Sequence, residues 1–325
     1  MKKAFIAIVG LTLSAAVAEG ILLLRVHLDP WRLAALLECL ALMLGAFVAF
    51  TRDDFIERLK KWAFDSWLLA VLMPFTLLIP YLILAYCTHT FSRLALAKLA
   101  AYIAVPLLLL FPNRLAYTER ASWRDFAAIA SLGVPVGAGW LSGIWIWPED
   151  IYIFRPIFCV CVGAYVFLVI RGLKDAGYKL IFTGSDLTEG AINFLAFFLL
   201  AIPLGLWLHF IHPHMRHVGV FTFIADFVGI YLTVAIPEEF LFRGILQNLL
   251  VKTFKHPHIE VKGLLAASVI FGLSHLHHAP VPNWRYAIMA TVAGVFYGNA
   301  WRVQKRTSSS AFTHALVDTV WHFWF

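Results

Sequence analysis

The sequence predicts an all-α fold, a polytopic transmembrane bundle of about eleven helices. Of its 325 residues 61% are hydrophobic and only 14% are charged, and its mean hydropathy is +0.80. A soluble globular domain carries about a quarter charged residues, so this composition excludes that class. Apolar runs of about 20 residues, the length that crosses a bilayer, fill most of the chain. We therefore expect the function to lie in or beside the membrane.

Eleven apolar runs are predicted as spans. They lie at residues 4–24, 31–50, 62–86, 92–111, 126–147, 151–170, 190–211, 218–250, 263–279, 284–300 and 308–325. Residues 16–18 in the first run could form a signal-peptidase site, but the apolar run resumes at Ile21 and continues to Leu24. We therefore expect this first helix to stay uncleaved.

Lys and Arg residues alternate between the predicted loops. One side of the membrane receives 18 of them and the other side 7, with Arg243 inside a helix. The positive-inside rule then predicts a cytoplasmic N-terminus and, after an odd number of spans, an outer C-terminus. No basic cluster exceeds a few residues, so the net charge of +7 indicates topology and not a nucleic-acid partner.

Polar residues are distributed unequally along the chain. The runs before residue 175 are nearly featureless, whereas intramembrane polar residues multiply after the polar loops at 171–179 and 183–189. We predict an accessory helical region at 1–175 and a functional module at 176–325. The four cysteines lie in apolar runs without metal-site spacing and are expected to be buried thiols. They are Cys39, Cys87, Cys159 and Cys161.

Ionisable side chains inside the last spans are the candidates for a functional site. A charged side chain costs about 2.5–3.5 kcal/mol at the centre of a membrane helix. A group of them must therefore face one another or water. The group comprises Glu238, Glu239, Arg243, His275, His314 and Asp318.

Helical spacing separates the roles of the two glutamates. Glu239 and Arg243 are four residues apart with the acid first, the favourable order for an ion pair on one helix face. Glu238 is turned about 100° away and can point into a cavity as a free base. His314 and Asp318 share a face by the same spacing.

The depth of these groups predicts that they can meet. Along ideal helices Glu238 lies about 21 Å from Lys252, and His275 about 20 Å from Lys262. Because both lysines fall on the predicted cytoplasmic side, we expect a site that opens towards the cytoplasm. Pro237 lacks a backbone N–H and can bend its helix beside the site.

Three motifs in this part of the chain resemble those of a known family. They are Glu238-Glu239-x-x-x-Arg243, Phe271-x-x-x-His275 and His314-x-x-x-Asp318. In this order, inside successive late spans, they resemble the CPBP family of CAAX-processing type II and bacteriocin-processing glutamic intramembrane proteases. The resemblance covers about residues 220–325 and leaves the first half of the chain unexplained.

The resemblance implies a role for each motif. Glu238 would activate a water for attack on a peptide carbonyl, helped by His275. Glu239, Arg243 and Phe271 would be supporting residues. The substrate would be a membrane protein or a lipidated peptide, and catalysis would need no metal.

One position departs from the family pattern. His314 and the residue four positions later would line the oxyanion site, and the family often has Asn at that last position. Asp318 would repel an oxyanion if it were ionised. It must then be protonated by its apolar surroundings or orient a histidine such as His322.

Other interpretations of the same residues stay open. Glu238, His275 and His314 could supply three zinc ligands and leave a position for water. The glutamates and Arg243 could also form a buried structural ion network. The alternative functions are a proton- or ion-coupled transporter, which usually shows an internal repeat, and a non-catalytic immunity or assembly factor.

Overall fold

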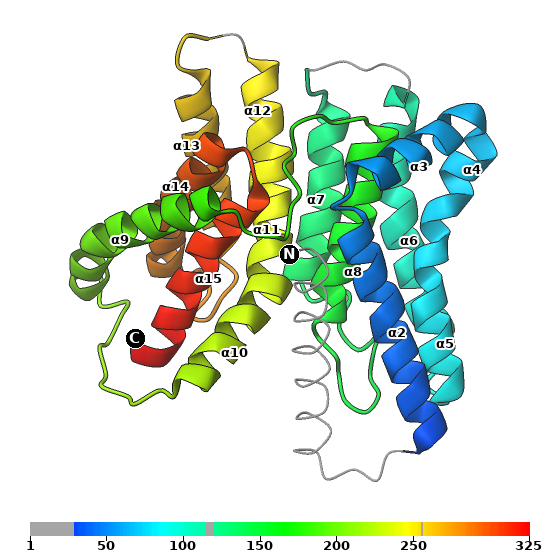
Figure 1. Ribbon diagram of the computed structural model, residues 1–325, viewed down its shortest axis with the longest axis horizontal. Helices are drawn as coiled ribbons and strands as arrows, with labels where there is room; N and C mark the ends of the chain where they lie inside the picture. The colour runs from blue at the N-terminus through cyan, green and yellow to red at the C-terminus, as the bar shows by residue number, and fades with distance from the viewer. Residues whose placement is uncertain (1–28, 115–119, 255) are drawn as a thin grey trace.

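The computed structural model describes residues 29–114, 120–254 and 256–325, and all regular structure in these ranges is helical (Figure 1). The predicted run 4–24 lies outside the described residues. The α-helices are α2 (Pro30–Ala49), α3 (Asp53–Asp65), α4 (Trp67–Leu72), α5 (Ile79–Cys87), α6 (Arg93–Leu110), α7 (Trp123–Gly137), α8 (Phe154–Ala164), α9 (Gly184–Trp207), α10 (Val220–Ile230), α11 (Ile236–Glu239), α12 (Asn248–Thr253), α13 (Ile259–Leu273), α14 (Trp284–Gln304) and α15 (Thr307–Trp324). Short 3-10 turns are η1 (Met73–Leu78) and η2 (Phe111–Asn113), and π-helical turns are η3 (Tyr165–Ile170), η4 (Tyr231–Ala235) and η5 (Phe240–Gln247).

Five helical stretches are long and apolar enough to cross a membrane. They are Pro30–Ala49, Trp67–Cys87, Arg93–Asn113, Gly184–Trp207 and Val220–Thr253. Large apolar side chains cover the outside of the molecule, among them Leu199 at 81% exposure and Phe221 at 78%. Only lipid can cover so much apolar surface. The chain is an integral multi-pass membrane protein, as its composition predicts.

The structure moves several of the predicted span boundaries, two of them in the first half of the chain. The run predicted at 62–86 begins at Trp67, because the preceding residues form the separate amphipathic helix α3. The run predicted at 126–147 is helical only to Gly137. Gly139 and Gly143 follow with φ angles of +68° and +69°, a backbone conformation that a helix cannot continue through.

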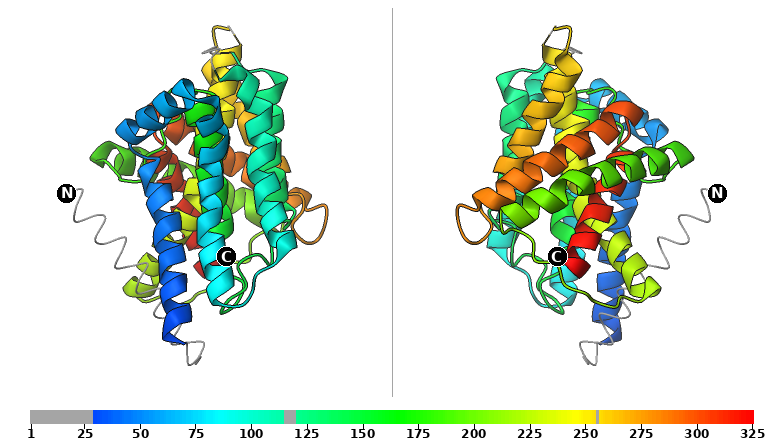
Figure 2. Two further views of the ribbon diagram at one scale, coloured as in Figure 1. Left: turned by 90° about the vertical axis from the view of Figure 1, so that its right-hand side faces the viewer. Right: turned by 90° about the vertical axis from the view of Figure 1, so that its left-hand side faces the viewer.

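The helices form two groups that lie side by side (Figure 1). The first, α2 to α8, packs around a large apolar core that includes Phe47, Leu107 and Phe158. The second contains α9 and α13 to α15, with a smaller core around Phe197 and Phe271. In this second group α9 and α14 run obliquely across α15 (Figure 2).

The continuous helix Val220–Thr253 stands between the two groups and serves both. Ile236 and Phe240 belong to the core of the first group. The opposite side of the same helix presents the glutamates to α15. Pro237 has no N–H to donate, and π-helical turns occur on both sides of α11. A widened turn of this kind is common at functional sites and changes which side chains share a face.

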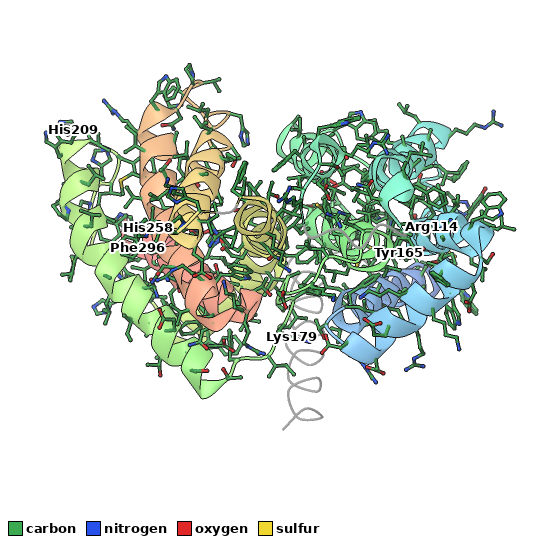
Figure 3. The ribbon with its side chains drawn as sticks, turned by 90° about the horizontal axis from the view of Figure 1, so that it is seen from above. Arg114, Tyr165, Lys179, His209, His258 and Phe296 are labelled. Carbon is green, nitrogen blue, oxygen red and sulfur yellow. The ribbon has the colours of Figure 1, made fainter. Side chains whose placement is uncertain are left out.

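An irregular segment at 171–183 passes between the two groups, with Lys179 at their boundary (Figure 3). Its Tyr178 hydroxyl donates to the carbonyl of Phe47 in the first group at 3.0 Å. On the other side, the carbonyl of Gly177 accepts the N–H of Thr307 at 2.8 Å. We call this segment the connecting strap, since it bonds both groups.

Candidate active site

The predicted ion pair between Glu239 and Arg243 is present and completely buried. Arg243 Nε donates to Glu239 Oε2 at 3.0 Å, and neither side chain is exposed. The hydroxyl of Ser310 also bonds Glu239 Oε2, and His314 Nδ1 lies 2.9 Å from Glu239 Oε1. Three partners thus hold the Glu239 carboxylate, which leaves it little capacity for a reaction.

Two glycines of α14 make room for the Arg243 guanidinium. A Cβ atom added at Gly294 would lie 3.2 Å from Arg243 Nη2, and one added at Gly298 would lie 3.3 Å from Nη1. The guanidinium also stacks over the ring of Phe271, with its centre 5.3 Å from the ring centroid. Phe271 therefore packs as a supporting residue, in a cation–π contact that is strong where water is excluded. The Gly-x-x-x-Gly spacing of Gly294 and Gly298 is the sequence signal that could have predicted this close helix approach.

Glu238 points elsewhere, as the one-residue offset predicts. Its side chain is 35% exposed and lines a cavity, whereas that of Glu239 is fully buried. Its Oε2 atom is buried without a hydrogen-bond partner and lies 4.0 Å from His314 Nε2. A buried carboxylate oxygen without a partner is costly. The exposed part of the same side chain lies in the cavity lining, where a water or a substrate group can reach it.

His314 lies between carboxylates on both of its nitrogens. Its Nδ1 faces Glu239, and its Nε2 lies 3.3 Å from Asp318 Oδ2. Its ring stacks on that of Tyr297 at 4.5 Å between centroids. The prediction that Asp318 could orient His322 is wrong, because His322 Nε2 lies 3.6 Å from Asp226 of α10 instead.

His275 lies beyond the end of its helix, although the run was predicted to extend to residue 279. Helix α13 ends at Leu273 because side chains replace the next turn. The Ser274 hydroxyl donates to the Phe271 carbonyl at 2.7 Å, and His275 Nδ1 bonds the same oxygen at 2.8 Å. Since a carbonyl only accepts, His275 Nδ1 carries the hydrogen and Nε2 keeps its lone pair.

A cavity of about 230 Å³ brings these residues together. Its polar side is formed by Glu238, His275, His314 and Asp318. Its remaining wall is mostly apolar and aromatic, and the sequence analysis identified none of its members. They include Phe197, Phe198, Ile202, Phe210, Tyr286, Met289, Tyr297, Val317, Trp321 and Phe325.

The residues that line the cavity gather towards one set of helix ends. Its lining comes from the C-terminal half of α9, the end of α13, the beginning of α14 and the end of α15. These ends lie away from Lys252 at the end of α12 and Lys262 at the start of α13 (Figure 1). The predicted cytoplasmic opening rested only on the distances of Glu238 and His275 from the lysines at one set of helix ends. About 21 Å through a hydrocarbon core about 30 Å thick leaves a group nearer the opposite surface.

The histidines near the cavity and the four cysteines are the remaining side chains that could bind a metal ion. Within the described ranges no group of three or more His, Cys, Asp or Glu side chains is arranged to hold a metal ion. His278, in the turn after α13, stacks on His275 and Tyr286, and burial lowers its pKa. All four cysteines are free, and three of them are buried, whereas Cys87 is exposed.

In this multi-pass helical membrane protein, two carboxyl groups and two histidines thus meet on one internal cavity. The Rce1-like family, described as type II CAAX prenyl endopeptidase Rce1-like, matches residues 220–320. This segment contains all three motifs, so the predicted resemblance is confirmed, and it supports a CAAX-type membrane protease. No curated protein and no solved structure matches the chain.

Proposed function

We propose that this protein is an intramembrane endopeptidase in which Glu238 activates water for attack on a peptide bond. One observation carries the proposal. Of two adjacent glutamates, Glu239 is fully buried and held by Arg243, Ser310 and His314, whereas the partly exposed side chain of Glu238 lines a cavity and its Oε2 has no hydrogen-bond partner. A structural ion network has no need for the second carboxylate in that position.

The chemistry follows from this arrangement. Glu238 accepts a proton as the water oxygen bonds to the peptide carbonyl carbon, and the carbonyl oxygen becomes an oxyanion. His275 offers the lone pair of Nε2 to the same cavity and helps to hold the water. One well-placed proton-transfer group contributes a factor of about 10²–10⁴ to the rate.

The cavity wall suggests the class of substrate. Apolar and aromatic side chains line most of it, and two of the apolar helices long enough to cross a membrane, Gly184–Trp207 and Val220–Thr253, contribute to the wall. Such a wall accepts an apolar peptide segment or the lipid of a lipidated peptide, and the matched family is described as acting on prenyl substrates. We propose a membrane protein or lipidated peptide as the substrate.

The orientation combines the charge rule with the position of the cavity. We propose that the ends bearing Lys252 and Lys262 face the cytoplasm, with the N-terminus also cytoplasmic. The cavity, which lies towards the other helix ends, then opens near the outer surface.

Replacing the base without changing its size tests the proposal. Membrane proteomes would be compared between cells with the wild type, with Glu238→Gln and with Asp226→Asn. Asp226 is a membrane carboxylate of α10 outside the cavity lining, so it is the matched control. We expect uncleaved precursors to accumulate with Glu238→Gln alone. Identical membrane proteomes for Glu238→Gln and the wild type would refute the hydrolase.

Two further measurements separate the alternatives. A zinc chelator should leave cleavage by the purified protein unchanged. Inhibition reversed by zinc would instead support ligation by Glu238, His275 and His314. Proton flux into proteoliposomes that depends on Glu238, without new peptide termini, would support a transporter.

A further inference from the structure

The hydrogen bonds of His314 require a proton that the scheme above does not use. Glu239 accepts from the permanently charged Arg243, so it is an ionised acceptor and Nδ1 of His314 is its donor. Nε2 then lies 3.3 Å from Asp318 Oδ2 and 4.0 Å from Glu238 Oε2. A lone pair on Nε2 would face two acceptors. A proton must therefore lie between Nε2 and Asp318, on one atom or the other.

Counting the charges around this proton gives the same answer. Three carboxyl groups, those of Glu238, Glu239 and Asp318, surround a single permanent cation, Arg243. Inside a membrane such an excess of negative charge is costly unless a proton is retained.

Among the described residues, the other titratable groups that line the cavity beside Asp318 are His275 and His278, after α13, and Tyr286 and Tyr297 of α14. No Lys or Arg side chain of the described ranges is among the lining residues. His322, which contacts Asp226, and Arg306, which pairs with Asp186, lie outside the lining.

We propose that Asp318 is the general acid of the reaction and that it delivers this proton to the leaving amine. The proposal rests on the proposed hydrolase and adds a second reacting carboxyl group to it. Asp318 has access to a substrate, because its side chain is 29% exposed and lines the cavity beside Glu238.

The proton transfers balance over one turnover. Water loses a proton to Glu238 and bonds to the carbonyl carbon. The C–N bond breaks as Asp318 protonates the amine nitrogen, which leaves Glu238 protonated and Asp318 ionised. The proton on Glu238 then returns through His314 Nε2, which lies 4.0 Å from one carboxylate and 3.3 Å from the other. Two carboxyl groups that meet at one imidazole nitrogen allow this return without an external acid.

A general-acid role explains why this chain has Asp at position 318, where the family often has Asn. An amide can donate a hydrogen bond to an oxyanion, but it cannot release a proton to an amine. The carboxyl group of Asp318 can do both in its protonated form.

The dependence of the rate on the leaving group tests the assignment. The full-length protein in detergent would be given a peptide substrate and the matching aryl ester, whose leaving group departs without protonation. We expect Asp318→Asn to slow amide cleavage about 10²–10⁴-fold and ester cleavage by less than about tenfold. Asp318→Glu, which retains the acid, should keep amide cleavage well above that of Asp318→Asn.

Each other outcome has a definite meaning. Equal losses on amide and ester in Asp318→Asn would show a structural or oxyanion role and overturn the proposal. Unchanged amide cleavage would overturn it as well. If Asp318→Asn fails to fold, Asp318→Glu is the deciding variant. Amide cleavage by Asp318→Glu that is no faster than in detergent without the protein would contradict a general acid. Glu238→Gln should lose both substrates equally, and its failure to do so would refute the hydrolase rather than this inference.

Discussion

Two arginine–carboxylate pairs are buried, one at the first helical group and one on the helix Val220–Thr253 beside the second group, yet their surroundings differ. In the first group Arg171 Nε donates to Asp125 Oδ1 at 2.7 Å, and the other oxygen of Asp125 accepts from the backbone and hydroxyl of Ser122 at the start of α7. On the helix Val220–Thr253 the carboxylate of Glu239, which pairs with Arg243, also bonds His314 of the second group, and His314 borders the cavity. The ion pair is the same interaction in both places. Of the two, only the pair of Glu239 and Arg243 lies next to the cavity and bonds a histidine, so only this pair can influence a reaction there.

The cores of the two groups differ in the same way. Phe158 in the first core has no exposed surface and is surrounded by other apolar side chains. Ile202 of α9 packs on one side only, since it borders the cavity. We therefore expect the first group to carry most of the stability and the second to carry the reaction.

The largest effect is expected from removing either buried arginine. Arg171→Met and Arg243→Met each leave a buried carboxylate without its cation, which costs about 3–5 kcal/mol of unfolding free energy. Only Arg243→Met should also reduce the activity of the molecules that remain folded, because Glu239 then holds His314 differently. Unfolding in mixed micelles and activity per folded molecule measure the two effects. Similar specific activity in both variants would remove the distinction between the pairs.

Truncating one side chain in each core gives the next largest contrast. Phe158→Ala should cost about 3–5 kcal/mol, since it leaves a void in a filled core. Ile202→Ala should cost about 1 kcal/mol, because part of this side chain already faces open space. We expect Ile202→Ala to change KM for the substrate and Phe158→Ala to leave KM unaltered. The same unfolding measurement with substrate titrations checks this, and equal losses of stability would show that the cavity is filled.

A methyl group added to α14 should have a smaller effect. Gly298→Ala places a Cβ 2.7 Å from Gln247 Oε1 and close to Arg243, so about 1–3 kcal/mol of stability should be lost. Gly45→Ala in α2 meets nothing within 4 Å and should stabilise its helix by about 0.5–1 kcal/mol. Thermal unfolding compares the two. A neutral Gly298→Ala would show that the guanidinium has room to move.

The smallest perturbation tests the orientation and leaves stability unchanged. In a Cys87→Ser background, Val281→Cys places a thiol at the cavity end, and Phe254→Cys places one at the opposite end, both at exposed positions. A membrane-impermeant maleimide on intact cells should label position 281 and reach position 254 only after permeabilisation. The reverse labelling pattern would place the cavity on the cytoplasmic side.

The sequence was sufficient where local spacing decides the geometry. Hydropathy predicted the helical membrane fold, and the one-residue offset between Glu238 and Glu239 predicted which carboxylate is paired and which faces the cavity. These properties depend on one helix at a time.

How the helices pack against one another could not be predicted from the sequence, for physical reasons. The spacing of His314, Asp318 and His322 on one face of α15 allows Asp318 to contact either histidine, and it is the packing of α15 against α10 that brings His322 to Asp226. The side on which the cavity opens depends on helix tilt and on the early end of α13 at Leu273. The aromatic wall was indistinguishable from ordinary core residues, since both are apolar and helical.

The connecting strap restricts how this chain can be divided. Gly177 has a φ of +67°, and a Cβ there would lie 2.2 Å from the carbonyl of Lys305, so the strap is threaded where no other residue fits. Lys179 reaches back to Asp53 at 2.9 Å. A fragment that starts at residue 176 would lack the first part of the connecting strap and the first-group residues that the rest of the strap bonds. It would also expose the side of the helix Val220–Thr253 that packs against the first group. Helices α2 to α8 therefore support the helix that carries Glu238 and Glu239, and shortened versions of this protein should keep them.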